Sequence, residues 1–302
     1  SAEVTGSVDV TGSVQFGYTA ITTVGGWSTG GPLATPRALL GAAGTQAAAL
    51  AFGGSTPAST GATEEYNGVA QTWSPGNSTL NTDRTGVAGA GTQQAALAFG
   101  GTDGSTTTSQ RATEAYSSGV WSSMSDLIPG RSYLAGAGTQ TAALAFGGSP
   151  AITSTEQYNS GTWSPATSLT TGRRFLAAAG TQTAALAFGG STPITNATEE
   201  YSGGVWGPGG SNMITPRNQL AGSGTQAAAR AFGGADPVAT SATEEYNSGT
   251  WSAAPANMII ARPYLGGAGT QQAALAFGGI STGATEEWGV TPVAPPTTGG
   301  AW

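Results

Sequence analysis

The sequence predicts an all-β protein in which six similar units close into a single body. A phrase of eleven residues, Gly-Thr-Gln-x-Ala-Ala-x-Ala-Phe-Gly-Gly, occurs six times in the 302 residues. An arginine stands 15 residues before each of its phenylalanines, and a Thr-Glu-x-aromatic sequence follows each Gly-Gly pair. The phenylalanines lie 42 to 47 residues apart, at Phe52, Phe99, Phe146, Phe188, Phe232 and Phe277. A period of this length is typical of an array of one repeated supersecondary unit.

Each unit is expected to contain four short antiparallel strands. In the third unit the first strand follows the arginine, at residues 134–138, and a tight Thr-Gln turn leads to a second strand that ends in Phe-Gly-Gly. Thr-Glu-x-Tyr then forms the third strand. A turn of the Asn-Ser-Gly type leads to the fourth strand at Thr-Trp-Ser.

The second strand of each unit shows an apolar pattern with period two. In the second unit Ala95, Leu97 and Phe99 share one face, and Ala96 and Ala98 share the other. Alanine and leucine also favour helix. A run of about six residues between glycines is too short for a stable isolated helix, so we predict a strand.

Four-stranded units with both faces buried predict the blades of a propeller. Between four and eight such blades close around an axis, which removes exposed sheet edges. The sixth unit reaches Trp288 without a Thr-Trp-Ser sequence of its own, whereas Trp27 stands alone ahead of the first unit. The segment around residues 20–28 is therefore predicted to supply the outer strand of the last blade. The expected domains are an N-terminal anchoring arm at residues 1–19, a propeller at 20–290 and a Pro/Gly-rich tail at 291–302.

The order of these motifs resembles a known family. An arginine, an apolar strand ending in Gly-Gly, and then a spaced tyrosine and tryptophan resemble the kelch motif, from Trp27 to Trp288. The resemblance implies a six-bladed kelch-like β-propeller whose loop face binds partners. The wording Ala-Gly-Thr-Gln-x-Ala-Ala-Leu-Ala-Phe-Gly-Gly, followed by Ala-Thr-Glu-Glu-Tyr-Asn, also resembles repeats in structural proteins of marine tailed bacteriophages. That second resemblance implies a location in a virion.

The composition argues against several classes of function. Only 8% of the residues are charged, the net charge is −7, and all nine cations are arginine. This balance disfavours binding to nucleic acids or to anionic membranes. No apolar run is long enough for a membrane span, and no signal peptide opens the chain. Cysteine and histidine are both absent, so we expect no catalytic residues, no cofactor and no metal site, and a protein that is not an enzyme.

The connections after each Gly-Gly pair are the first candidate for partner binding. They vary in length and share one face of the predicted disc, where recognition loops commonly lie on a rigid scaffold. The longest, at residues 102–112, carries Asp103 and Arg111 as candidate contact residues. The alternative is that loop length drifts freely where nothing packs.

The spaced arginines are the second candidate. They begin the innermost strands on the same face, at Arg37, Arg84, Arg131, Arg173, Arg217 and Arg262. One interpretation makes them a cradle for an acidic peptide or a sugar acid. The other pairs each with the glutamate of a Thr-Glu sequence, and the equal numbers of the two residue types favour these internal ion pairs.

Two further features favour structural roles. Arg230 occupies a position where the other five units have leucine; a buried arginine there would extend to the rim or pair with Asp236, and neutral drift at a peripheral site is favoured over a functional role. The repeated tyrosines and tryptophans are expected to form the core between blades rather than a platform for sugars.

The N-terminal segment repeats the phrase Val-Thr-Gly-Ser-Val, with Val4, Val8, Val10 and Val14 as anchoring candidates. Such a segment has the character of a strand that adds to a neighbour's sheet; the alternative is a flexible leader. The leading hypothesis is a structural or decoration protein of a phage-like virion, anchored to other virion proteins through this arm. The alternative is a receptor-binding module that recognises a host glycan or surface protein through its variable loops.

Overall fold

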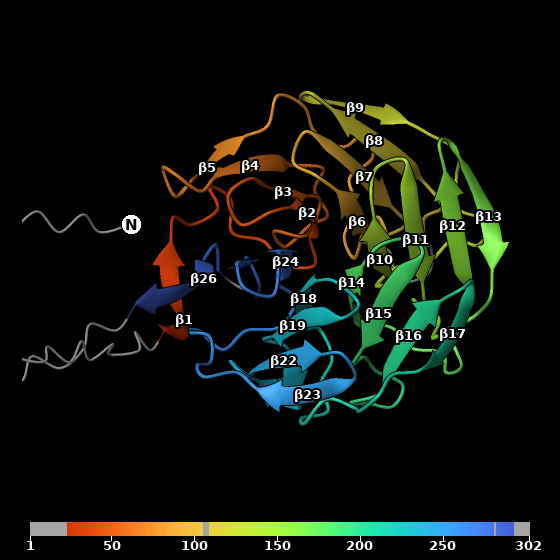
Figure 1. Cartoon of the computed structure of the whole chain (residues 1–302). Helices are drawn as coiled ribbons and strands as arrows, with labels where there is room; N and C mark the ends of the chain where they lie inside the picture. Colours follow the sequence, from red (N-terminus) through yellow and green to blue (C-terminus); the bar gives the residue numbers. More distant parts are fainter. Residues whose placement is uncertain (1–22, 105–108, 281, 293–302) are drawn as a thin grey trace, which may run out of the picture.

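The chain forms a six-bladed β-propeller (Figure 1). The computed structural model describes residues 23–104, 109–280 and 282–292. Within these ranges the regular secondary structure is entirely β, and each blade is a sheet of four antiparallel strands. The predicted fold class and the number of blades are confirmed.

The blades follow the order of the chain, and the first strand of each lies nearest the axis (Figure 1). From the axis outward they are β2 (Gly41–Gly44), β3 (Ala49–Phe52), β4 (Thr63–Asn67) and β5 (Thr72–Pro75); β6 (Ala88–Gly91), β7 (Ala95–Phe99), β8 (Thr113–Ser117) and β9 (Val120–Ser123); β10 (Ala135–Gly138), β11 (Ala142–Phe146), β12 (Thr155–Asn159) and β13 (Thr162–Ala166); β14 (Ala177–Gly180), β15 (Ala184–Phe188), β16 (Thr198–Ser202) and β17 (Val205–Pro208); β18 (Ala221–Gly224), β19 (Ala228–Phe232), β22 (Thr243–Asn247) and β23 (Thr250–Ala253); and β24 (Gly266–Gly269), β25 (Ala274–Phe277), β26 (Thr285–Pro292) and β1 (Thr23–Gly30). A short hairpin, β20 (Ala235–Asp236) and β21 (Val238–Ala239), lies in the loop after β19.

The ring is closed by its N-terminal strand, as predicted. β1 pairs with β26 over eight residues, with Trp27 opposite Trp288. The indole of Trp27 donates a hydrogen bond of 3.0 Å to the hydroxyl of Thr243 in the preceding blade. The other five blades make the same bond between an outer-strand tryptophan and a threonine of the preceding blade: Trp73 to Thr285, Trp121 to Thr63, Trp163 to Thr113, Trp206 to Thr155 and Trp251 to Thr198. Trp27 thus completes a set of six.

Aromatic side chains form the core between blades, as the sequence predicts. Phe99 of one blade meets Trp163 of the next at 5.1 Å between ring centroids, and Trp163 also contacts Tyr158. Phenylalanine–tryptophan contacts of 4.8–5.1 Å recur at all six junctions. The glutamines of the Thr-Gln turns add a second connection, because each donates to two backbone carbonyls of the preceding blade: Gln46, Gln93, Gln140, Gln182, Gln226 and Gln271.

Close packing of the innermost strands explains the small residues near the axis. A Cβ atom on Gly89 would lie 2.3 Å from the carbonyl oxygen of Ala42 in the neighbouring blade, a distance that real Cβ atoms do not adopt. Glycine is therefore required at position 89, and the other residues of the innermost strands are glycine or alanine apart from Ser223. The axial channel that they leave is narrow and lined mainly by glycine and alanine.

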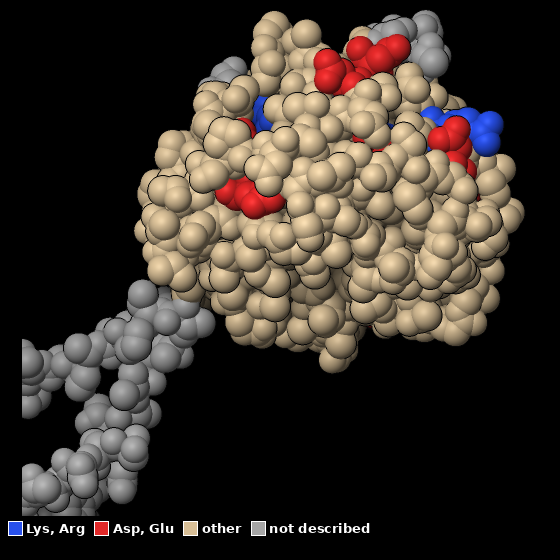
Figure 2. All heavy atoms as spheres, turned by 90° about the horizontal axis from the view of Figure 1, so that it is seen from above, with Lys and Arg blue, Asp and Glu red and all other residues tan. Residues whose placement is uncertain are grey.

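The two faces of the disc differ in charge. We call the face with the post-Gly-Gly connections and the spaced arginines the loop face, and the face with the Thr-Gln turns the turn face. Figure 2 shows the coloured charges towards one side of the disc and none on the opposite side. Every exposed charged side chain of the described residues lies on a loop-face connection, at Asp83, Asp103, Arg111, Asp126 and Asp236.

Candidate functional site

A closed ring of backbone hydrogen bonds surrounds the axis on the loop face. Each blade contributes the residue two positions after its spaced arginine, and its N–H donates to the carbonyl of the equivalent residue in the preceding blade. The six bonds are 2.8–2.9 Å long and join Leu39, Gly86, Tyr133, Phe175, Gln219 and Tyr264. All six residues have left-handed backbone, with φ between 55° and 62°. We call this set the axial ring.

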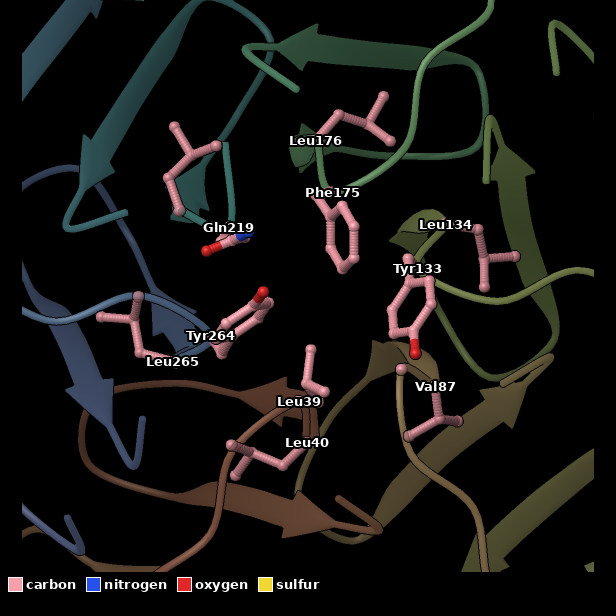
Figure 3. Close-up of a pocket in the computed structure, with 12 residues that line it drawn as sticks. Leu39, Leu40, Val87, Tyr133, Leu134, Phe175, Leu176, Gln219, Tyr264 and Leu265 are labelled. Carbon is pink, nitrogen blue, oxygen red and sulfur yellow. The ribbon is translucent and has the colours of Figure 1, made fainter. Parts of the chain in front are cut away.

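The axial ring surrounds a cavity of about 120 Å³ at the mouth of the channel. Its walls are the ring residues and the buried side chains that follow them, Leu40, Val87, Leu134, Leu176, Leu220 and Leu265. Figure 3 shows the side chains of Phe175 and Tyr264 directed towards the centre from different blades. The ring positions are the chemically varied part of this wall, because the positions that follow them are all leucine or valine.

Three aromatic side chains, from Tyr133, Phe175 and Tyr264, line part of the cavity wall. Tyr133 and Phe175 lie 4.4 Å apart between ring centroids, and Phe175 meets Tyr264 edge to face at 5.8 Å. Gly86 makes room for Tyr133, since a Cβ atom there would lie 2.5 Å from the tyrosine ring. Gln219 contributes an amide, and its backbone carbonyl accepts the N–H of Tyr264. The wall therefore combines flat apolar surfaces with hydroxyl and amide groups.

Arg174 stands beside this wall. Its guanidinium carbon lies 5.4 Å from the centroid of the Phe175 ring. Burial raises the pKa of Tyr264, with a further contribution from Tyr133, and the positive charge of Arg174 acts in the opposite direction. The side chain of Arg174 is half-buried, and among the described residues it makes no ion pair.

The six spaced arginines do not line the cavity. Each is at most 2% exposed and pairs with the Thr-Glu glutamate of its own blade, as the ion-pair interpretation predicts. Five of the pairs have N–O distances of 2.6–3.2 Å, and the sixth joins Arg262 to Glu286. In every pair the glutamate also accepts a backbone N–H from the connection that enters its blade from the preceding one. The pairs therefore fix the loop-face connections to the blades.

Burial dominates the electrostatics of these pairs. It lowers the pKa of all six arginines, that of Arg131 to about 10, while the partner glutamates act in the opposite direction. Burial likewise raises the pKa of Glu156. Losing one partner of such a pair would leave an uncompensated buried charge.

Arg230 has a partner other than the one predicted. Its guanidinium lies 3.5 Å from the ring centroid of Trp288 and pairs with Glu245 at 2.6 Å, not with Asp236. The pairing of β19 with β22 places Glu245 directly opposite Arg230, whereas Asp236 lies in the β20–β21 hairpin. The expectation of an Asp236 contact was wrong because cross-strand register, not proximity in sequence, selects the partner.

The remaining candidates lie away from the cavity. Asp103 and Arg111 are exposed on the loop after β7, and the Nε of Arg111 donates to the carbonyl of Leu127 at 2.6 Å. The anchoring candidates lie outside the described residues: Val4, Val8, Val10 and Val14. β1 begins at Thr23 and β26 ends at Pro292, where the sequence places the propeller at residues 20–290.

No group of three or more acidic residues that could hold a metal ion occurs among the residues that the structure describes. In the same ranges no helix is long and apolar enough to cross a membrane. No protein-family model matches the chain, and no curated protein matches it in sequence. The fold is thus established by the structure alone, and the function is inferred from the site.

Sequence reasoning missed the axial ring and Arg174, although a signal was present. When the six units are aligned on the spaced arginine, the position two residues later reads Leu, Gly, Tyr, Phe, Gln and Tyr, while the next reads leucine or valine. A varied position inside a repeated phrase indicates a site that the fold does not constrain to one side chain.

Proposed function

We propose that this β-propeller is a non-enzymatic recognition module that binds a surface ligand of a host through its loop face. One observation carries the proposal: the axial ring presents five different residue types around a cavity in an otherwise repetitive scaffold. The same face carries the exposed charges of the described residues. Ligand sites are typically concave and mostly apolar, with a few oriented polar groups.

The connections to the rest of the chain leave this face accessible. Thr23 pairs with Pro292 at the far end of the β1–β26 ladder, at the outer edge of the sixth blade and on the turn-face side. Chain that precedes Thr23 or follows Pro292 is therefore attached at the rim, away from the cavity. A module tethered there can present its loop face outward, which fits a kelch-like module on a phage-like virion.

A structural or decoration protein of such a virion is the second candidate. The turn face favours it, because this face repeats the same Thr-Gln turns and carries no exposed charge among the described residues. An uncharged, regular surface is suited to permanent contact with other virion proteins, because burying it desolvates no charged group.

The absence of cysteine allows a direct test. A single cysteine is introduced on the loop face, as Asp103→Cys, or on the turn face, as Gln94→Cys, and is coupled to a bulky maleimide. We expect the loop-face label alone to block capture by a panel of bacterial cells and immobilised glycans. Capture that persists with the loop-face label, together with loss of virion assembly with the turn-face label, would favour the structural role instead.

A further inference from the structure

We propose that the axial cavity binds the ring of a carboxylate-bearing sugar, with Arg174 pairing with the carboxylate and Phe175 and Tyr264 contacting the ring. The inference rests on the proposed recognition function and names the ligand class for its central site.

The cavity has the scale of a single ring and is open on one side. Its volume of about 120 Å³ is of the same order as the ~150 Å³ of a buried cavity that accommodates one benzene molecule, so a sugar ring would enter in part, with its substituents at the open mouth. The cavity opens at the loop face, so the rest of a glycan chain can leave it without a steric clash. A folded peptide segment would need a longer groove than this mouth provides.

The wall suits the amphipathic surface of a sugar. Phe175 and Tyr264 present ring surfaces and edges to the cavity, while Gln219 and the tyrosine hydroxyls supply donors and acceptors (Figure 3). Aromatic side chains with a polar group combine apolar contact with hydrogen bonding at one position. A ligand with alternating C–H and hydroxyl groups uses both.

Charge selects an acidic sugar over a neutral or cationic one. Seven of the nine arginines pair with glutamates, and Arg111 donates to a backbone carbonyl. Arg174 is the remaining arginine; its Nε is buried without a partner, and its NH1 reaches only Ser149, at 3.5 Å. A planar guanidinium binds carboxylates in a bidentate manner. The same cation beside Phe175 argues against an aromatic cage for an ammonium ligand.

The axial ring holds these groups in place before the ligand arrives. Left-handed backbone at Leu39, Tyr133 or Phe175 is unfavourable for a bulky residue, and such strain commonly occurs at ligand sites. The closed hydrogen-bond ring enforces it at all six positions. A preorganised site loses less entropy on binding.

The test uses the full chain and three soluble probes: sodium glucuronate, glucose and a short acidic peptide. Saturation-transfer NMR and isothermal titration should show saturable binding of glucuronate, with glucose bound more weakly. Arg174→Gln should weaken glucuronate binding by about 10-fold or more and leave the binding of glucose unchanged. Arg111→Gln is the matched control, since it removes an arginine from the same face that does not stand beside the Phe175 wall of the cavity. A melting temperature equal to that of the wild type shows that each variant is folded.

Three results would overturn the inference: no saturable glucuronate binding, equal weakening by both arginine variants, or tighter binding of the acidic peptide than of glucuronate. The proposed function fails separately. If the label at position 103 blocks cell capture but glucuronate neither binds nor competes, the recognition role stands and the sugar acid is excluded. If glucuronate binds but no surface is captured, the recognition role fails.

Discussion

Tyr158 carries a buried hydroxyl without a hydrogen-bond partner among the described residues. Equivalent tyrosines bond the residue after Thr-Glu in the preceding blade: Tyr66 to Glu287 at 2.5 Å, Tyr116 to Glu65 at 2.6 Å and Tyr246 to Glu200 at 2.5 Å, while Tyr201 accepts a bond from Gln157 at 2.9 Å. The blade before Tyr158 has Ala115 at this position. We therefore predict that Ala115→Glu stabilises the protein.

The magnitude follows from the other blade junctions. A hydrogen bond to a charged group contributes about 1.5–3 kcal/mol, and ordering a glutamate side chain costs about 1–2 kcal/mol. The position is half-buried in all six blades, so no full desolvation cost is added. The expected gain is about 1 kcal/mol, which corresponds to roughly 2–4 °C in melting temperature for a chain of this size.

A double-mutant cycle with Tyr158→Phe measures the coupling. Denaturant unfolding of the wild type, the two single variants and the double variant should show that Ala115→Glu stabilises only when the hydroxyl of Tyr158 is present. Tyr158→Phe alone should be nearly neutral, whereas Tyr116→Phe should be destabilising because it leaves Glu65 unpartnered. A gain from Ala115→Glu that survives in the Tyr158→Phe background would refute the reasoning.

Three other outcomes are expected. Deleting residues 1–30 should destabilise the propeller by at least about 3 kcal/mol through loss of the Trp27 contacts; an unchanged melting temperature would contradict the closure. Arg230→Leu should cost about 1–2 kcal/mol because Glu245 loses its partner, and adding Trp288→Tyr should recover stability by supplying a hydroxyl; no recovery would refute the compensation. Burial raises the pKa of the core tyrosines, that of Tyr246 to about 12. Because the unfolded chain ionises first, stability should be complete below pH 10 and fall from pH 10 to 12 in a calorimetric titration; constant stability there would contradict it.

The fold was predictable because the sequence patterns that determine it lie within single units and recur in all six of them. Alternation in the Ala-Ala-Leu-Ala-Phe runs fixes the strands, and the isolated Trp27 predicts ring closure since every other blade has a tryptophan in its outer strand. The ion pairs were predictable for the same reason, because an arginine and a glutamate recur once in every unit. Repetition converts six weak local signals into one strong one.

The candidate site was less predictable because it depends on a contact that no single unit contains. Six residues from separate blades meet only after the ring has closed, and each then bonds to its neighbour through left-handed backbone. Arg174 lies one position after the structural Arg173, and the sequence alone does not show that the two arginines have different surroundings. Its exposure and lack of an ion pair become visible only when the blades are assembled.

The breaks in the repeat fall into two groups. Arg230 and Trp288 form a compensated pair. Trp288 stands where the other blades have a tyrosine, so Glu245 receives no tyrosine hydroxyl, and the guanidinium of Arg230 pairs with Glu245 instead. The axial ring differs. Left-handed backbone costs a residue other than glycine about 1–2 kcal/mol, yet Gly86 is the one glycine among the six positions. Stability alone favours glycine at such positions. The bulky side chains at this mouth are the physical basis on which we propose a recognition role for it.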